Sequence, residues 1–186
     1  MTPLLAPFIR GQRTAMVTPF ITGDVLEIGC NDAATLARNP PGLGRYVGTD
    51  IDDEALARAR VKFPNREFVK NNIESEPLGF HSEFDTVLMV ALIEHILNQR
   101  FLLETCHEAL RTGGKLVITT PTPFGNDIVH RTGARFGLFH KSVADHHVVI
   151  YGKRRLRAAA EMVGFTLKEH RYFQFGCNQL AVLEKV

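Results

Sequence analysis

Cysteine is scarce in this sequence, and no two cysteines stand at a spacing typical of metal ligands. Cys30, Cys106 and Cys177 are far apart and odd in number. No Cys-x-x-Cys pair occurs, so neither a zinc ribbon nor a disulfide framework is predicted. Reduced thiols in a cytoplasmic protein are therefore expected.

Long apolar runs and an excess of one charge are also missing. The strongly apolar stretch Val87–Ile93 stops at Glu94, far short of the roughly 20 residues that span a bilayer. Pro3 and Pro7 interrupt the first residues without a preceding basic segment, so no signal peptide is predicted. The 22 Lys and Arg nearly balance the 20 Asp and Glu. Neither a membrane nor a nucleic acid is therefore expected as a partner.

What the sequence does contain is an alternation of two kinds of segment within a single expected domain, residues 1–186. The expected strands are Val25–Ile28, Arg45–Thr49, Glu67–Val69, Thr86–Val90, Lys115–Thr119, Phe165–Phe173 and Asn178–Val186. The expected helices are Asp53–Phe63, Asn98–Leu110 and Lys153–Val163, with another beginning at Ala33. This predicts an α/β, Rossmann-like doubly wound sheet of about seven strands, mostly parallel, with a C-terminal antiparallel hairpin.

Local signals mark where these elements begin and end. Asp52 is placed to cap the helix expected at Asp53–Phe63. Gly113-Gly114 is expected to stop the helix at Asn98–Leu110. Residues 1–23 are expected to form a short cap helix over the edge of the sheet. Residues 121–150, with several prolines and glycines and four histidines, are expected to be a substrate-side loop or lid.

Two strand ends carry the first functional signal. Asp24–Ala33 reads as a buried strand followed by a turn, where Gly29 permits close backbone approach. About 20 residues later the next strand ends in Asp50. A carboxylate there can accept hydrogen bonds from the two hydroxyls of a ribose. The alternative is that Asp50 only caps a turn, although Asp52 and Asp53 can fill that role.

From about Asp24 to Val186 the chain resembles the class I S-adenosylmethionine-dependent methyltransferases. Their first motif, Val-Leu-Asp/Glu-x-Gly-x-Gly-x-Gly, corresponds to residues 25–33, with Glu27 and Gly29 in place. Asn31 and Ala33 stand where the second and third glycines are usual, and Asn tolerates a positive φ better than most residues. The resemblance implies S-adenosylmethionine as the cofactor, bound near Glu27, Gly29 and Asn31.

Later segments extend the resemblance in the expected order. Asp50 matches the ribose-binding acid, and Ile51 is expected beside the adenine. Asn72 replaces the acid that usually accepts from the adenine amino group, and Ile73 is the apolar residue next to it. Residues 83–95 and 110–118 are similar to the fourth strand, its following loop and the turn into the fifth strand. A nicotinamide dehydrogenase is disfavoured, because Asn31 occupies the position that a pyrophosphate needs bare.

The resemblance implies methyl transfer, most simply to the oxygen of a small molecule whose pocket is built by residues 1–23 and 121–150. A hydroxyl acceptor benefits from a general base, and the candidates are His95 and the loop histidines His130, His140, His146 and His147. Asp145 could orient His146 or His147. The alternatives stay open: His95 as a residue bonded to the backbone at a helix start, and the histidine pair as part of a solvated loop.

Metal binding is not expected. Related enzymes that bind a divalent ion have Glu-x-x-Glu-His after the fourth strand, and Ala91 replaces the first ligand before Glu94 and His95. The basic run Lys153–Arg155 with Arg157 reads as a solvated helix face, and an acidic or RNA substrate is the second reading.

Two other functions remain open at this point. One is an RNA-modifying methyltransferase, and the other is a non-catalytic S-adenosylmethionine-binding module, motivated by Asn31, Ala33, Asn72 and Ala91. The sequence carries no signal for an oligomeric state.

Overall fold

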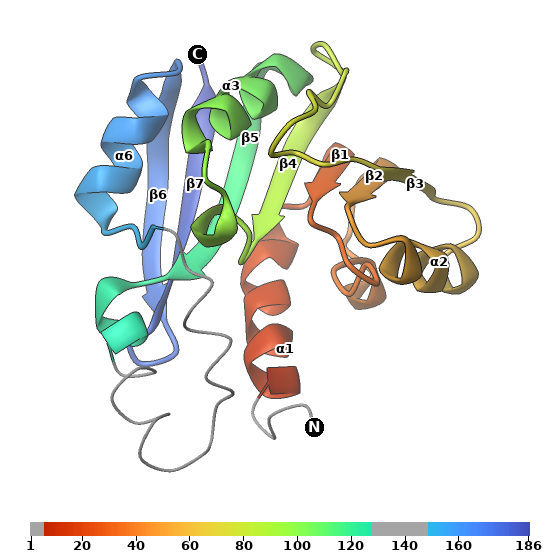
Figure 1. Cartoon of the computed structure of the whole chain (residues 1–186), viewed down its shortest axis with the longest axis horizontal. Coiled ribbons are helices and arrows are strands. Elements are labelled where there is room, and N and C mark those ends of the chain that lie inside the picture. Colours follow the sequence, from red (N-terminus) through yellow and green to blue (C-terminus); the bar gives the residue numbers. More distant parts are fainter. Residues whose placement is uncertain (1–5, 128–148) are drawn as a thin grey trace.

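The computed structural model describes residues 6–127 and 149–186, and they fold around a seven-stranded sheet in the order β3-β2-β1-β4-β5-β7-β6 (Figure 1). The strands are β1 (Gly23–Ile28), β2 (Leu43–Asp50), β3 (Glu67–Lys70), β4 (Phe84–Val90), β5 (Leu110–Pro121), β6 (Phe165–Phe173) and β7 (Asn178–Lys185). β7 is antiparallel to both β5 and β6, and the remaining pairs are parallel. The predicted fold class and C-terminal hairpin are confirmed.

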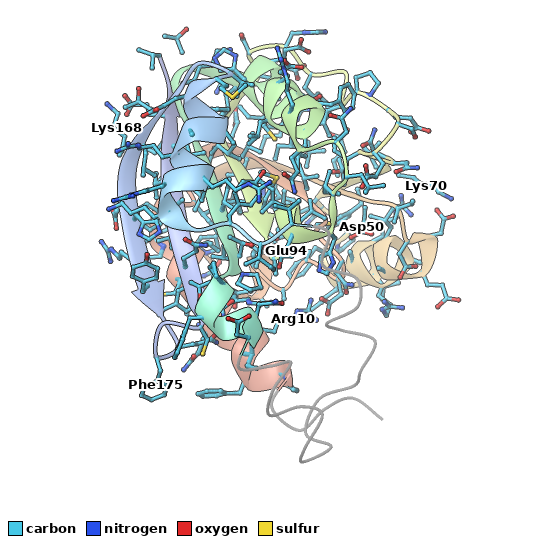
Figure 2. The ribbon with its side chains drawn as sticks, turned by 60° about the vertical axis from the view of Figure 1, so that its left-hand side comes forward. Arg10, Asp50, Lys70, Glu94, Lys168 and Phe175 are labelled. Carbon is cyan, nitrogen blue, oxygen red and sulfur yellow. The ribbon has the colours of Figure 1, made fainter. Side chains whose placement is uncertain are left out.

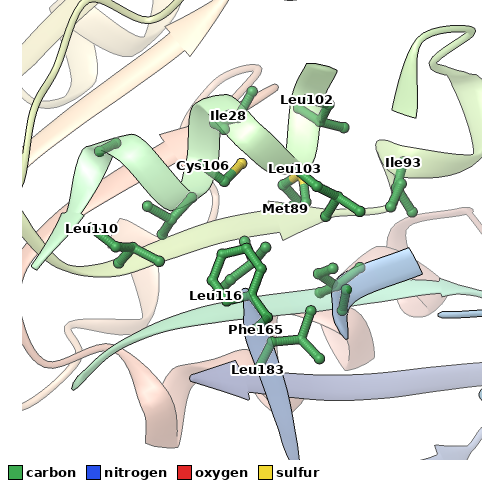
Figure 3. Close-up of a cluster of buried hydrophobic side chains, with 14 of the residues drawn as sticks. Ile28, Met89, Ile93, Leu102, Leu103, Cys106, Leu110, Leu116, Phe165 and Leu183 are labelled. Carbon is green, nitrogen blue, oxygen red and sulfur yellow. The ribbon is translucent and has the colours of Figure 1, made fainter. Parts of the chain in front are cut away.

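Helices cover both faces of the sheet. They are α1 (Ala6–Val17), α2 (Asp53–Lys62), α3 (Gln99–Ala109) and α6 (Lys153–Glu161), with 3₁₀ turns η1 (Thr18–Phe20), η2 (Leu36–Arg38) and η3 (Ile93–His95). One apolar cluster joins α3, through Leu102 and Leu103, and α6, through Leu156, to the sheet, where Phe165 of β6 belongs to it (Figure 3). Each of these side chains is at most 2% exposed, and burying one contributes roughly 1.5–3 kcal/mol. A second cluster on the other face includes Val17 of α1 and Leu56 of α2.

The helix expected from Ala33 is instead a run of turns that ends in η2. Asn31 and Ala33 have φ of +50° and +55°, and the left-handed region cannot start a right-handed helix. At the other end, Asn39 is left-handed with φ of +49°, and Pro40 disfavours helical backbone in the residue before it. The first turn is therefore not followed by the N-terminus of a long helix.

The two glycines expected to stop the preceding helix lie within β5 instead. α3 ends at Ala109, and β5 begins at the next residue. The pairing of β4 with β5 shifts between Phe84 and Thr86, so the chain bulges where Gly113 has a φ of +77°. The capping prediction for α2 is confirmed, because the Asp52 carboxylate accepts from the backbone N–H groups of Glu54 and Ala55 at 2.9 and 3.2 Å.

The segment 1–23 contains the expected helix, and α1 reaches past the carboxyl ends of the central strands (Figure 1). Val17, at the end of α1, is buried in the sheet. Arg13, one turn earlier, bonds to Asn178, which pairs with Pro121 at the end of β5. Arg10 reaches Asp32 in the turn after β1. The first half of α1 thus overhangs the edge where strands end. No helix in residues 6–127 or 149–186 has the length and apolar character needed to cross a membrane.

Candidate cofactor and acceptor site

The turn after β1 keeps the backbone shape of a glycine motif although two of its glycines are replaced. Gly29, Asn31 and Ala33 have φ of +70°, +50° and +55°. The N–H groups of Gly29 and Cys30 both donate to the carbonyl oxygen of Thr49 at the end of β2, at 2.8 and 3.0 Å. A Cβ at Gly29 would lie 3.0 Å from Leu92 Cδ1. The positive φ favours glycine at this position, and a Cβ would also require Leu92 to shift by a few tenths of an ångström.

Asp50 ties this turn to the end of β2. Its Oδ2 accepts from the backbone N–H of Asn31 at 2.8 Å, and its Oδ1 accepts from Asp52 N–H at 3.0 Å. Each carboxylate oxygen has further acceptor capacity, and the side chain remains partly exposed (Figure 2). Beside it, Ile51 is 58% exposed. The carboxylate next to an uncovered apolar side chain fits a ribose joined to a flat apolar base.

The neighbouring turn after β3 differs from what the resemblance implied. Asn72 Oδ1 already accepts from Glu74 N–H at 3.2 Å, and Ile73 is 7% exposed and belongs to the apolar core. Asn71 donates its backbone N–H to the carbonyl oxygen of Asp50 at 3.0 Å. Its Oδ1 is buried without a hydrogen-bond partner among the described residues. At this edge, the amide oxygen without a hydrogen-bond partner in the described residues therefore belongs to Asn71 and not to Asn72. Sequence reasoning assigned no role to Asn71.

Glu27 lies beneath the first turn and faces the core. Its Oε2 accepts from the hydroxyl groups of Thr35 and Tyr46, the latter at 2.5 Å. Burial raises the pKa of Glu27 from 4.5 to about 7, and the two hydroxyl donors only partly oppose this rise. Glu27 was predicted near the cofactor. In the structure its carboxylate accepts hydrogen bonds from Thr35, in the segment after the turn, and from Tyr46. Both of these partners are buried as well.

The segment after β4 separates two adjacent residues. His95 is exposed, whereas Glu94 is 1% exposed. Glu94 Oε2 accepts from Thr120 Oγ1, near the end of β5, at 3.0 Å. Burial raises the pKa of Glu94, and the charges of Arg13 and His95 oppose that rise. From the sequence, His95 was a candidate base, and Glu94 was considered only as a ligand of a metal site that was not expected. The apolar run that precedes Glu94 was the signal for its burial.

Arg13 forms the other long-range contact at this end of the sheet. Its Nε and one terminal nitrogen donate to Asn178 Oδ1 at 3.1 and 2.8 Å. Asn178 in turn donates to Gln174 Oε1, and Gln174 Nε2 donates to the carbonyl oxygen of Ile9 at 3.2 Å. The contact between Arg13 and Asn178 joins positions 165 residues apart. No local pattern in the sequence indicates it.

Several predicted features fall outside the described residues or away from this edge. His146, His147 and most of the loop 121–150 lie outside residues 6–127 and 149–186. Within those two ranges, no group of three or more His, Cys, Asp or Glu is close enough to hold a metal ion. The basic run is exposed on α6, where Arg157 pairs with Glu161 at 3.5 Å, as expected for a solvated helix face.

A hollow lies beside the first turn. It has a volume of about 600 Å³ and is lined by Pro7, Arg10, Gly11, Thr14, Ala34, Ala37 and Arg38. It therefore runs between α1 and η2 and does not include Asp50. The groups whose hydrogen bonding suits a ribose lie at the strand ends, outside this hollow.

Comparison with known proteins agrees with this geometry. A family model described as a methyltransferase domain matches residues 26–116. A probable S-adenosylmethionine-dependent methyltransferase of Mycolicibacterium smegmatis is 30% identical over 98 residues, which are 53% of this chain and 38% of that protein. A ubiquinone biosynthesis O-methyltransferase of Shewanella halifaxensis is 27% identical over 101 residues, covering 52% and 42%. The chain thus spans about two fifths of these curated relatives.

The solved structures extend the likeness to nearly the whole chain. An S-adenosylmethionine-dependent methyltransferase from Mesorhizobium loti superimposes with a TM-score of 0.72 at 17% identity, over 94% of this chain and 96% of that one. At this identity the likeness shows the fold. Together with the domain match over residues 26–116, it makes the chain similar to the class I S-adenosylmethionine-dependent methyltransferases. S-adenosylmethionine is the cofactor of that family.

Proposed function

We propose that this protein is an enzyme that methylates a small molecule at oxygen, using S-adenosylmethionine. The observation that supports this best is the hydrogen bond between Asp50 Oδ2 and Asn31 N–H, 2.8 Å long. It holds a ribose-binding carboxylate against a left-handed turn, with exposed Ile51 alongside. The turn lacks two of the usual glycines but keeps the backbone that they provide.

In this proposal each residue has a limited task. Asp50 accepts hydrogen bonds from the ribose hydroxyls, and Ile51 covers one face of the adenine. When bound, S-adenosylmethionine supplies a methyl group on a sulfonium whose departing thioether is neutral. The protein therefore contributes mainly by positioning the acceptor in line, which can be worth roughly 7–11 kcal/mol.

A hydroxyl acceptor also has a proton to lose. His95 lies just past the end of β4 and is exposed, so we assign it as the general base. His146 and His147 stay as predicted alternatives from the loop 121–150. Replacing His95 with Ala should lower kcat by roughly 100-fold or more and leave the Kd for S-adenosylhomocysteine unchanged. A variant with wild-type kcat would remove His95 from this role.

A small acceptor is supported by two observations. The relative from Shewanella halifaxensis is named as an O-methyltransferase of ubiquinone biosynthesis. In addition, α1 overhangs the carboxyl edge of the sheet, and Arg10 and Arg13 fasten it there. The densest basic run lies on α6 as a solvated face, so it gives an RNA substrate no particular support.

The direct test is calorimetry of the folded chain with S-adenosylmethionine and S-adenosylhomocysteine. We expect saturable binding of both, and no heat at millimolar cofactor would overturn the proposal. A thermal-shift screen of hydroxyl, amine and thiol compounds in the presence of S-adenosylhomocysteine then identifies acceptors. Mass spectrometry of the product locates the methyl group. Cofactor binding without any methylated product across the screen would favour a non-catalytic binding module.

A further inference from the structure

Arg13 is a cation held in place without a carboxylate. Arg10, Arg45 and Arg111 each form an ion pair with an acid at the surface. In the described parts of the chain no ion pair includes Arg13, whose two bonded nitrogens both donate to the neutral amide oxygen of Asn178. The residue is half-buried. Burial opposes its charge and lowers its pKa, yet a guanidinium stays protonated in proteins.

The guanidinium is also fixed in orientation. Asn178 is 6% exposed and donates to Gln174, whose own amide donates to Ile9 on α1. The contacts run from α1 to the β6–β7 turn and back to α1. A planar donor set that is already oriented loses little freedom when it binds a planar anion.

The position of Arg13 is on the acceptor side of the site. Asn178 begins β7, and β7 is separated from β1 by β4 and β5. Three steps of about 4.8 Å place the start of β7 roughly 14 Å from the turn that contains Gly29. The structure therefore sets Arg13 apart from the proposed ribose and adenine contacts, beyond the end of β4, where the proposed function places methyl transfer.

Glu94 interacts electrostatically with Arg13, but no ion pair joins them in the described residues. The Glu94 carboxylate is buried and accepts from Thr120 Oγ1 at 3.0 Å. Burial also raises the pKa of Glu94, which weakens its competition for the guanidinium.

We propose that Arg13 determines acceptor specificity by binding a carboxylate on the methyl acceptor, which is then a hydroxy acid. This inference rests on the proposed function. A guanidinium presents parallel N–H donors that match the two oxygens of a carboxylate. The bonds from Nε and one terminal nitrogen to Asn178 hold the remaining terminal N–H groups at the acceptor side of the sheet.

The test uses the chain with S-adenosylhomocysteine bound. Its probes are salicylate, 3,4-dihydroxybenzoate and mandelate, each paired with its own carboxamide. The amide keeps the shape of the acid and removes its charge. We expect wild-type protein to bind at least one acid about tenfold or more tightly than its amide. In R13Q that preference should be lost, while R13K should retain part of it.

Arg38 offers a matched control. It also fastens α1 through neutral oxygens, donating from Nε to Thr14 Oγ1 at 2.9 Å and from a terminal nitrogen to the carbonyl oxygen of Gly11. R38Q should lower Tm by an amount similar to R13Q and keep the preference for the acid. A preference lost equally in both variants would show that Arg13 only holds α1, and would overturn the inference.

Three other results separate this inference from the proposed function. A wild-type complex that binds no acid better than its amide overturns the inference alone. A loss of S-adenosylhomocysteine affinity in R13Q, with 5′-methylthioadenosine affinity unchanged, would assign Arg13 to the carboxylate of the cofactor and also overturn it. A wild-type chain that does not bind S-adenosylhomocysteine contradicts the proposed function, and the inference falls with it.

Discussion

The two halves of the sheet's carboxyl edge are built from different kinds of contact. In the cofactor half, formed by the turns after β1, β2 and β3, backbone N–H groups meet nearby side chains, as where Asn31 donates to Asp50 19 residues later. In the acceptor half, formed by the ends of β4, β5 and β7 with α1, side chains meet across the chain. Arg13 and Asn178 are 165 residues apart. The contacts of the cofactor half are formed by neighbouring strand ends. The contacts of the acceptor half form only when α1 packs against the sheet.

This difference predicts that substitutions will affect one half without the other. The largest effect should come from Glu27→Gln, beneath the cofactor half. A carboxyl with a pKa of 4.5 when unfolded and about 7 when folded holds a proton in the native state that the unfolded chain releases. The free energy of unfolding therefore falls as pH rises from 4.5 to 7, by about 3 kcal/mol.

Glutamine can accept the same two hydroxyl bonds without a charge. We expect E27Q to be more stable than wild type by up to about 3 kcal/mol at pH 8 and little changed near pH 4.5. Denaturant unfolding across this range measures the difference. The control is E104Q, at an exposed residue paired with Arg100, whose stability should follow wild type. An E27Q curve parallel to wild type would contradict the raised pKa.

Asp50→Ala tests the cofactor half directly. Two charge-assisted hydrogen bonds to a ribose contribute roughly 1.5–3 kcal/mol each before competition with water. We expect affinity for S-adenosylhomocysteine to fall about 100-fold, which corresponds to about 2.7 kcal/mol. Calorimetry measures it. D53A, which removes an exposed ion pair with Lys70, should bind within twofold of wild type, and equal affinities for both variants would exclude Asp50 as a ribose ligand.

Asn178→Ala tests the acceptor half. It removes the oxygen to which Arg13 donates twice and leaves a half-buried guanidinium without that partner. We expect a loss of about 2 kcal/mol in the free energy of unfolding and an unchanged Kd for S-adenosylhomocysteine. E161A, which removes an exposed pair on α6, should cost less than about 0.5 kcal/mol. A large change in cofactor affinity in N178A would show that the two halves are coupled.

The smallest effect is expected at Ala33, where opposing contributions nearly cancel. Replacing a left-handed alanine with glycine relieves roughly 1–3 kcal/mol of backbone strain. It also removes a buried methyl group worth about 0.8 kcal/mol and adds about 0.5–1 kcal/mol of backbone entropy. We expect A33G to lie within about 1 kcal/mol of wild type. A59G, at a buried helical position of α2, has no strain to relieve and should be clearly destabilised in the same unfolding experiment.

Much of the fold was predictable because its elements have local signals. Apolar runs mark the strands, and Asp52 caps α2 as expected. The errors arose where two local rules competed. Ala33 was expected to begin a helix, but the left-handed turn and the prolines after Asn39 exclude one. Gly113 was expected to end α3, but a strand can accommodate glycine at a bulge.

The candidate site divides in the same way. By itself the sequence determined the Rossmann-like class and the meeting of Gly29, Asn31 and Asp50, because parallel strands bring their carboxyl ends to one edge. Only the tertiary structure decided that Glu94 is buried while His95 is exposed, and that Arg13 meets Asn178. Burial and contacts between distant side chains depend on how α1 and the last strands pack. No local pattern of residues encodes that packing.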